Sequence, residues 1–225
     1  MAAAFGTAKP LAIDLFCGLG GWTEGLLAEG YYVVGFDIER HEYGEAKYPG
    51  QLVIQDVLTL HGSQFKDAAL IVASPPCQAY SYRAMPWKRA KALPPPDNAL
   101  FEACFRIQRE AIEAAGHFIP LVVENVRGAQ PWVGRSRWNF GSYHLWGDVP
   151  ALMPMQGTRK GTGTWFGKYE GVKQGGDWFN ASQPYIARLS SSKSKARKKA
   201  SALIAKIPLP LAQHIARAWK PQCAH

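Results

Sequence analysis

Three short segments of the chain carry groups that could do chemistry together. They have the sequences DLFCGLGG (residues 14–21), SPPCQ (74–78) and ENV (124–126). They supply a glycine-rich loop, a thiol and a carboxyl group. Each follows or ends an apolar run typical of a buried parallel strand. Because functional groups in open α/β sheets gather at the carboxyl ends of strands, we expect all three segments at one sheet edge.

The glycine-rich loop favours a nucleoside-containing ligand. Gly18, Gly20 and Gly21 allow the backbone to approach a ligand closely and then to enter a helix. Asp37 ends the next apolar run, about twenty residues on, where an acidic side chain binds a ribose hydroxyl pair. The glycine spacing differs from the Gly-x-Gly-x-x-Gly of dinucleotide sites, which favours S-adenosylmethionine. The alternative is an ordinary tight turn between strand and helix.

Cys77 is a candidate nucleophile. Pro75 and Pro76 stiffen the turn before it and so fix the direction of the thiol. A thiolate held in this way can attack an electrophilic carbon. The alternative is a buried structural cysteine.

Glu124 is a candidate acid at the end of the run 118–123. A carboxyl group at the rim of an apolar sheet is partly desolvated, which raises its pKa and lets it donate a proton. The alternative is a helix cap or an ion pair at the sheet edge.

The elements that must position these groups alternate between strand and helix. This alternation predicts an α/β fold with a doubly wound, mostly parallel sheet. Strands are predicted at residues 11–16, 31–36, 52–54, 69–73 and 118–123, and helices at 23–29, 41–48, 98–115 and 211–219. We expect a catalytic and cofactor-binding core, a small irregular recognition region, and a basic segment whose C-terminal helix returns to the core. Their respective boundaries are 1–137, 138–190 and 191–225.

Composition favours a nucleic-acid partner in the cytoplasm. The 225 residues carry a formal charge of +9, which suits a polyanion, nucleic acid first. No apolar run is long enough to cross a bilayer, and the N-terminus lacks a signal pattern, so we expect no membrane partner. The four cysteines are widely spaced, which indicates reduced thiols and no metal site.

Together, the three segments resemble the DNA (cytosine-5)-methyltransferase family. Residues 14–21 match the family's cofactor loop, 76–78 its nucleophile motif and 124–126 its acid motif, in the family's order. The resemblance covers residues 11–126. It implies a Rossmann-like, S-adenosylmethionine-dependent methyltransferase that methylates C5 of cytosine in double-stranded DNA and releases S-adenosylhomocysteine. It also implies a covalent Cys77 adduct with a base flipped out of the helix.

The resemblance also implies residue roles. Cys77 would attack C6 of cytosine, and Glu124 would hold and protonate N3. The cofactor would be held by Phe16, Gly18, Leu19, Gly20, Gly21, Asp37, Ile38, Asp56 and Pro76. Ser81 matches a family position near the DNA backbone. The basic side chains of Arg83, Lys88 and Arg89 suit contacts with DNA phosphates.

The chain departs from the family pattern after residue 126. The family's Gln-x-Arg-x-Arg motif is represented only by residues 133–137, which lack the glutamine. We assign Arg137, with Arg135 as the second choice, to cytosine O2; the alternative is that both bind phosphates. The family's late Gly-Asn motif has no counterpart before the last helix.

The recognition region is also short. This suggests a short target sequence, loose specificity, or help from a homodimer or another subunit. Compact forms of this kind resemble those of phages and prophages that protect DNA from restriction, which implies a bacterial or phage-infected host cytosol. Two other functions stay open: an RNA cytosine methyltransferase, and a non-catalytic homologue that only binds DNA.

Overall fold

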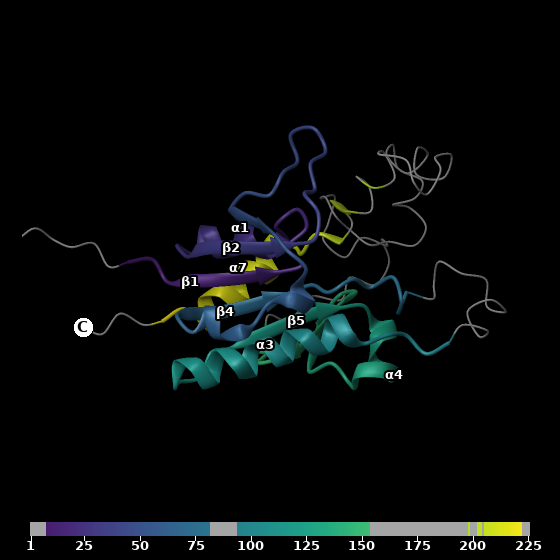
Figure 1. Ribbon diagram of the computed structural model, residues 1–225. Helices are drawn as coiled ribbons and strands as arrows, with labels where there is room; N and C mark the ends of the chain where they lie inside the picture. The colour runs from purple at the N-terminus through teal and green to yellow at the C-terminus, as the bar shows by residue number, and fades with distance from the viewer. Residues whose placement is uncertain (1–7, 82–93, 154–197, 199–201, 204, 222–225) are drawn as a thin grey trace, which may run out of the picture.

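The fold is built on one seven-stranded sheet. The computed structural model describes residues 8–81, 94–153, 198, 202–203 and 205–221. Within them the strands lie in the order β3-β2-β1-β4-β5-β7-β6 (Figure 1). Five are parallel: β1 (Leu11–Leu15), β2 (Tyr32–Asp37), β3 (Gln51–Ile54), β4 (Ala68–Ala73) and β5 (Leu121–Asn125). The doubly wound, mostly parallel sheet predicted from the sequence is therefore confirmed.

The last two strands extend the sheet beyond the boundary expected after residue 137. β6 (Trp138–Phe140) and β7 (Tyr143–Gly147) form an antiparallel hairpin, and β7 also pairs antiparallel with β5. Residues 138–147 thus form part of the sheet, although the sequence assigned them to the recognition region. The rest of that region from residue 154 onward, and the boundary at 190, lie outside the described residues.

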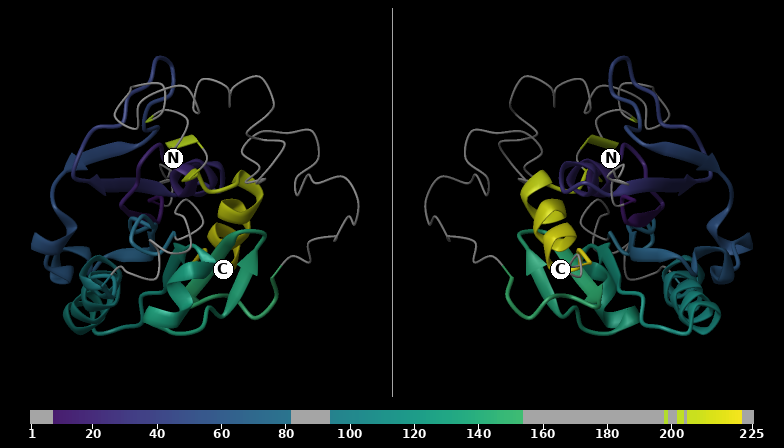
Figure 2. Two further views of the ribbon diagram at one scale, coloured as in Figure 1. Left: turned by 90° about the vertical axis from the view of Figure 1, so that its right-hand side faces the viewer. Right: turned by 90° about the vertical axis from the view of Figure 1, so that its left-hand side faces the viewer.

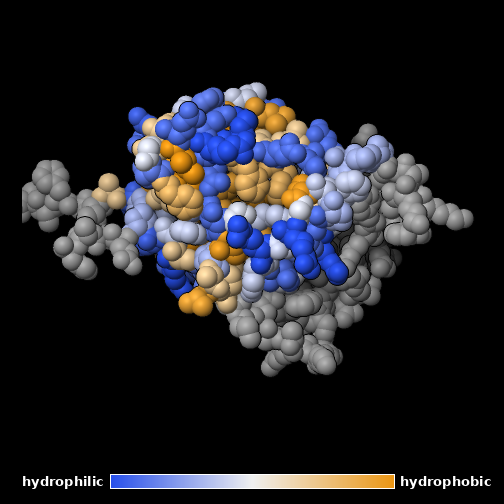
Figure 3. Space-filling model, turned by 90° about the horizontal axis from the view of Figure 1, so that it is seen from below, coloured by the Kyte–Doolittle hydropathy of each residue, from blue (hydrophilic) through white to orange (hydrophobic). Residues whose placement is uncertain are grey.

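Helices cover both faces of the sheet. α3 (Ala99–Ala115) packs on one face through Phe101, Cys104, Ile107 and Ala111, which recur at helical spacing. α1 (Gly21–Ala28) and α7 (Leu209–Ala218) pack on the other face. Figure 3 shows the α3 side, where an apolar area lies between two hydrophilic bands. None of the described helices combines the length and the apolar character that a membrane crossing requires.

Short helical segments complete the connections between these elements. They are η1 (Val57–Thr59), η2 (Gly62–Phe65), η4 (Arg127–Ala129) and α4 (Gln130–Val133). η1 and η2 lie between β3 and β4, whereas η4 and α4 link β5 to β6. The two connections therefore contain no long helix.

The last described helix packs on the core of the protein. α7 lies beside α1 (Figure 2), and a Cβ atom on Gly25 would stand 2.4 Å from the Cβ of Ala212. Only glycine permits so close an approach of the two helices. At the far end of α1, Glu29 pairs with Arg217 at 2.7 Å and accepts a hydrogen bond from Gln213. α1 and α7, far apart in the sequence, therefore form one packed layer.

The helix predicted over residues 41–48 is wrong. This segment is irregular, with a short bridge between Tyr43 and Ala46 around Gly44, whose φ is 68°. Tyr48 is buried, and its hydroxyl group lies 2.6 Å from Thr23 Oγ1. Burial of Tyr48 against α1 thus overrides the local helical preference.

A buried hydrogen-bond chain ties β1 to α1. Thr23 donates to Asp14 Oδ2 at 2.6 Å, and Tyr48 contacts the same hydroxyl group. Asp14 is fully buried, and its Oδ1 has no hydrogen-bond partner within the described part of the chain. Burial raises the pKa of Asp14 to about 7, although the hydrogen bonds from Thr23 act to lower it. This chain fixes both ends of the turn that carries the glycine-rich loop.

A Thr23→Val substitution should test this buried hydrogen-bond chain. It removes the donor to Asp14 and the partner of Tyr48, which should cost about 1–3 kcal/mol of unfolding free energy. Because the folded pKa of Asp14 is raised, stability falls as pH rises from 3.8 towards about 7 and then levels off. Without Thr23 this pKa rises further, so the loss should be larger at pH 8 than at pH 5. Urea unfolding at both pH values measures it, and equal losses would contradict the assignment.

Candidate active site

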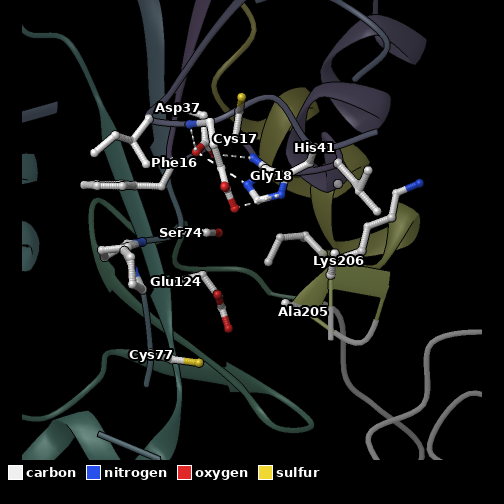
Figure 4. A pocket seen from close by; sticks show the side chains of 18 of the residues that line it. Phe16, Cys17, Gly18, Asp37, His41, Ser74, Cys77, Glu124, Ala205 and Lys206 are labelled. Atoms are coloured by element: carbon white, nitrogen blue, oxygen red, sulfur yellow. Dashed lines mark hydrogen bonds and ion pairs between the residues drawn. The ribbon is translucent and has the colours of Figure 1, made fainter. Parts of the chain in front are cut away.

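A cavity of about 550 Å³ lies at the carboxyl edge of the parallel strands (Figure 4). Its lining includes all three segments that the sequence singled out. Gly18 of the glycine-rich loop, Cys77 after β4 and Glu124 at the end of β5 all line it. The convergence expected from the strand ends is therefore observed, and the roles assigned to these residues stay predictions.

The glycine-rich loop presents its backbone to the cavity. Gly18 has a φ of 51°, and a Cβ atom built on it would meet nothing within 4 Å. Its N–H group donates to Asp37 Oδ2 at 2.9 Å, so the loop after β1 is fixed to the end of β2. α1 begins three residues later, at Gly21. A ligand here would contact bare backbone near a helix N-terminus, where anionic groups are stabilised.

Asp37 is a buried carboxylate with three donors around it. Besides Gly18, the N–H group of Glu39 donates to its Oδ1, and His41 Nε2 lies 3.5 Å from the same oxygen. Burial raises the pKa of Asp37, but hydrogen bonds from His41 and the two N–H groups outweigh it and lower the pKa overall. Asp37 is thus an ionised acceptor in the wall of the cavity.

Cys77 and Glu124 are held next to each other by the ends of β4 and β5. Asn125, directly after Glu124, donates from Nδ2 to the carbonyl oxygen of Pro75 at 3.0 Å. This hydrogen bond joins the end of β5 to the turn that carries Cys77. Glu124 is 6% exposed, and Figure 4 shows both side chains on the same side of the cavity. The thiol and the carboxyl group can therefore face one bound molecule.

Most of the predicted cofactor residues line this cavity. Those that do are Phe16, Gly18, Leu19, Gly21, Asp37, Ile38, Asp56 and Pro76. Gly20 does not line it, because it packs against Pro49 and Tyr48. Ser81 is described but is also absent from the lining. Arg83, Lys88 and Arg89 lie outside the described residues.

The structure does not bring Arg135 and Arg137 to this cavity. Both line a second cavity, between α3, α4 and β7. η4 and α4 link β5 to β6, and the two arginines lie after α4, in the residues that lead into β6. Their assignment to cytosine O2 stays a prediction that no contact with Cys77 or Glu124 supports.

The sequence did not single out every residue of the site. His41 lines the cavity four residues after Asp37, a spacing that could have indicated its place. Lys206 and Ile207 form part of the opposite wall, and Lys206 pairs with Glu24 of α1. From the sequence we expected the C-terminal helix to return to the core, but these two side chains were not among the predicted site residues. Clusters of three or more metal-binding side chains are absent from the described residues.

His41 provides a pH-dependent test of the site. Its hydrogen bond to Asp37 raises the pKa of His41, burial opposes this, and the charges of Glu39 and Lys198 act in opposite directions. Protonated His41 therefore stabilises the folded state below its unfolded pKa, and this contribution is lost as pH rises through the folded pKa. In an Asp37→Asn variant, the pKa of His41 should fall back towards its ordinary range. An NMR titration with ¹⁵N-labelled histidine measures it, and an unchanged titration would contradict the pairing.

Comparisons with known proteins show which proteins the chain is similar to. A search of curated proteins found no match. Among solved structures, the chain is similar to one described as a DNA modification methyltransferase encoded within a prophage (E. coli), at 20% identity and a TM-score of 0.37. That similarity covers 56% of this chain and 35% of that one. The Dnmt2 methyltransferase of S. pombe gives 18% identity and a TM-score of 0.37, over 54% of this chain and 36% of that one.

The methyltransferase EhMeth of Entamoeba histolytica is also similar, at 16% identity and a TM-score of 0.38. This similarity covers 57% of this chain and 41% of that one, so the chain spans well under half of each of these three proteins.

The family match comes from the sequence. The model of the family described as C-5 cytosine-specific DNA methylase matches residues 11–130, more than half of the 225 residues. The matched range contains the glycine-rich loop, Cys77 and Glu124, which share one cavity. The chain therefore belongs to the C-5 cytosine-specific DNA methylase family.

Proposed function

We propose that this protein transfers a methyl group from S-adenosylmethionine to C5 of cytosine in DNA, through a covalent adduct with Cys77. The observation that carries the proposal is the single cavity lined by a glycine-rich loop, a thiol and a buried carboxyl group. A methyltransferase needs a cofactor wall, a nucleophile and a proton donor within reach of one base. S-Adenosylhomocysteine would be the second product.

The residues present fit S-adenosylmethionine. A volume of about 550 Å³ is in the usual range for sites of small ligands. Asp37 would accept hydrogen bonds from the ribose hydroxyl groups, and the bare backbone at Gly18 would accommodate the methionine end. Ile38 is 70% exposed beside the cavity, and an adenine ring between it and Phe16 would cover this apolar surface. When bound, the cofactor supplies a methyl group on a positively charged sulfur.

Cys77 would act as the nucleophile. C5 of cytosine is a poor nucleophile, and a thiolate bond to C6 makes C5 resemble an enamine carbon. C5 can then form a bond to the methyl group. Loss of the C5 proton and elimination of the thiolate restore the aromatic ring and release Cys77.

Glu124 would act on N3 of the same base. Attack at C6 places negative charge on the ring, and a proton held at N3 relieves it. The position of Glu124 supports this role, because the side chain is buried at the end of β5 and lines the same cavity as Cys77. The hydrogen bond from Asn125 to Pro75 would keep this acid in register with the thiol.

The cavity also requires an unpaired base. A cytosine stacked and paired within a duplex cannot present C6 to a thiol that lines a cavity in the protein. The base would have to rotate out of the helix, as in other enzymes that act on bases. The charge of +9 supports a polyanionic substrate. The same charge suits RNA, so the experiment includes both nucleic acids.

Covalent trapping tests this function. Duplex DNA containing 5-fluorocytosine is incubated with the protein and S-adenosylmethionine, then separated on a denaturing gel. Because fluorine cannot leave as a proton does, the protein should remain attached to the DNA through Cys77. A Cys77→Ser variant should give no shifted band and should lower methyl transfer to ordinary DNA by about 10³-fold or more.

Cofactor binding provides the control. Cys77→Ser should bind S-adenosylmethionine with nearly unchanged affinity by calorimetry, because the thiol is expected to contact the base and not the adenosine. Trapping of an RNA oligonucleotide in place of DNA would change the substrate to RNA. Cofactor binding without trapping on several DNA and RNA sequences would indicate a non-catalytic homologue and would refute the proposal.

A further inference from the structure

The second cavity is an open groove of about 800 Å³. We call it the arginine groove. Arg109, Arg135 and Arg137 line it together with the aromatic rings of Phe101, Phe105 and Trp146. It lies between α3, α4 and β7. It is distinct from the cavity that contains Cys77.

The three arginines lack anionic partners within the described residues. All three are exposed, and none of their guanidinium groups forms a hydrogen bond or ion pair with another described residue. Two carboxyl groups also line the groove. One of them, Asp148, already accepts hydrogen bonds from Gln108 Nε2 and the Leu121 N–H group. The groove therefore keeps an excess of positive charge, which fits an anionic ligand.

The aromatic side chains of the groove favour a ligand that is larger than an isolated anion. Phe101 packs edge-on against Trp146, with ring centroids 5.4 Å apart. Trp146 Nε1 donates to the carbonyl oxygen of Gly134, so its polar atom is satisfied within the protein. Trp132, beside these rings, is 39% exposed. Phe101 and Trp146 are buried beneath the groove, so Trp132 supplies its exposed ring. Exposed arginines beside such a ring suit a nucleic-acid strand, whose phosphates pair with guanidinium groups and whose sugars or bases contact the ring.

A chain of hydrogen bonds joins the groove to the turn that carries Cys77. The N–H group of Tyr80 donates to the carbonyl oxygen of Cys77, and the Tyr80 hydroxyl group donates to Asn98 Oδ1 at 2.9 Å. Asn98 Nδ2 in turn donates to the carbonyl oxygen of Trp132 at 3.2 Å. These hydrogen bonds hold the groove and the turn that carries Cys77 in a fixed relation to each other.

We infer that the arginine groove binds the phosphate backbone of the same DNA whose cytosine is presented to Cys77. This inference rests on the proposed function. It gives Arg135 and Arg137 a phosphate-binding role in place of the contact with cytosine O2, and it adds Arg109 of α3, which lies outside every motif singled out in the sequence. The groove thereby extends the DNA-binding surface along α3.

The test compares the wild-type protein with an Arg109→Gln, Arg135→Gln, Arg137→Gln triple variant. Fluorescence anisotropy gives the Kd for a cytosine-containing DNA duplex over a series of salt concentrations. The triple variant should bind about tenfold or more weakly at low salt. Its plot of log Kd against log salt should be less steep by about one unit per arginine. Its affinity for S-adenosylmethionine should be unchanged, because no groove arginine lines the other cavity.

A matched control removes three positive charges elsewhere. Lys9 and Lys66 precede β1 and β4, at the ends of the strands opposite the cavity with Cys77, and Lys47 lies in the connection between β2 and β3. All three are exposed, and none of their ammonium groups forms a hydrogen bond or ion pair with another described residue. Their replacement by Gln lowers the net charge equally, so any general electrostatic effect is the same in both variants. This control should keep a salt dependence close to that of the wild type.

Three outcomes would overturn the inference. Equal affinity and equal salt dependence in the wild type and the triple variant would do so and leave the proposed methylation intact. An equal loss in the control variant would show that only net charge matters. A wild type that binds S-adenosylmethionine but no DNA would remove the proposed substrate as well. Should the triple variant fold poorly, Arg109→Gln alone, on the exposed face of α3, should still reduce the salt dependence by about one unit.

Discussion

The hydrogen bond from Thr23 to buried Asp14 is the constraint on which the site depends. It fixes the end of β1 to the first turn of α1, and the glycine-rich loop lies between these two points. A carboxyl group without access to water is costly unless it is hydrogen-bonded or protonated. The loop therefore has little freedom to move without exposing or unpairing Asp14. The hydrogen bond from the Gly18 N–H group to Asp37 then fixes the loop to the end of β2 as well.

A second local constraint governs the other half of the cavity. The amide of Asn125 holds the turn after β4 against the end of β5, so the positions of Cys77 and Glu124 are coupled. Proline at 75 and 76 removes two backbone donors from this turn, and the side chain of Asn125 supplies a hydrogen bond in their place. Cys77, in the turn after β4, and Glu124, near the end of β5, are thus positioned by neighbouring backbone, and the adjacent sheet keeps them in register.

Much of the fold could be predicted because strand ends carry strong local signals. Apolar runs that stop at Asp37, at Pro75 or at Glu124 identify parallel strands and the edge where they end. The wrong prediction of a helix at 41–48 shows where local signals are insufficient. The burial of Tyr48 depends on contact with α1, which is remote in sequence. The positions of Arg135 and Arg137 depend on how η4 and α4 turn, and short turns have weak sequence signals. Lys206 enters the cavity wall through packing of α7 on α1, which no spacing in the sequence encodes.

The contact of α1 with the C-terminal segment has a consequence for synthesis of the protein. One wall of the cavity begins within the first twenty residues, and another is formed by residues 205–207. During translation the first strands can form long before the second wall leaves the ribosome. A nascent chain therefore displays the glycine-rich loop without the surface that encloses it. A cofactor can be enclosed only after residues 205–207 have left the ribosome, so cofactor binding would follow folding of the sheet and would not guide it.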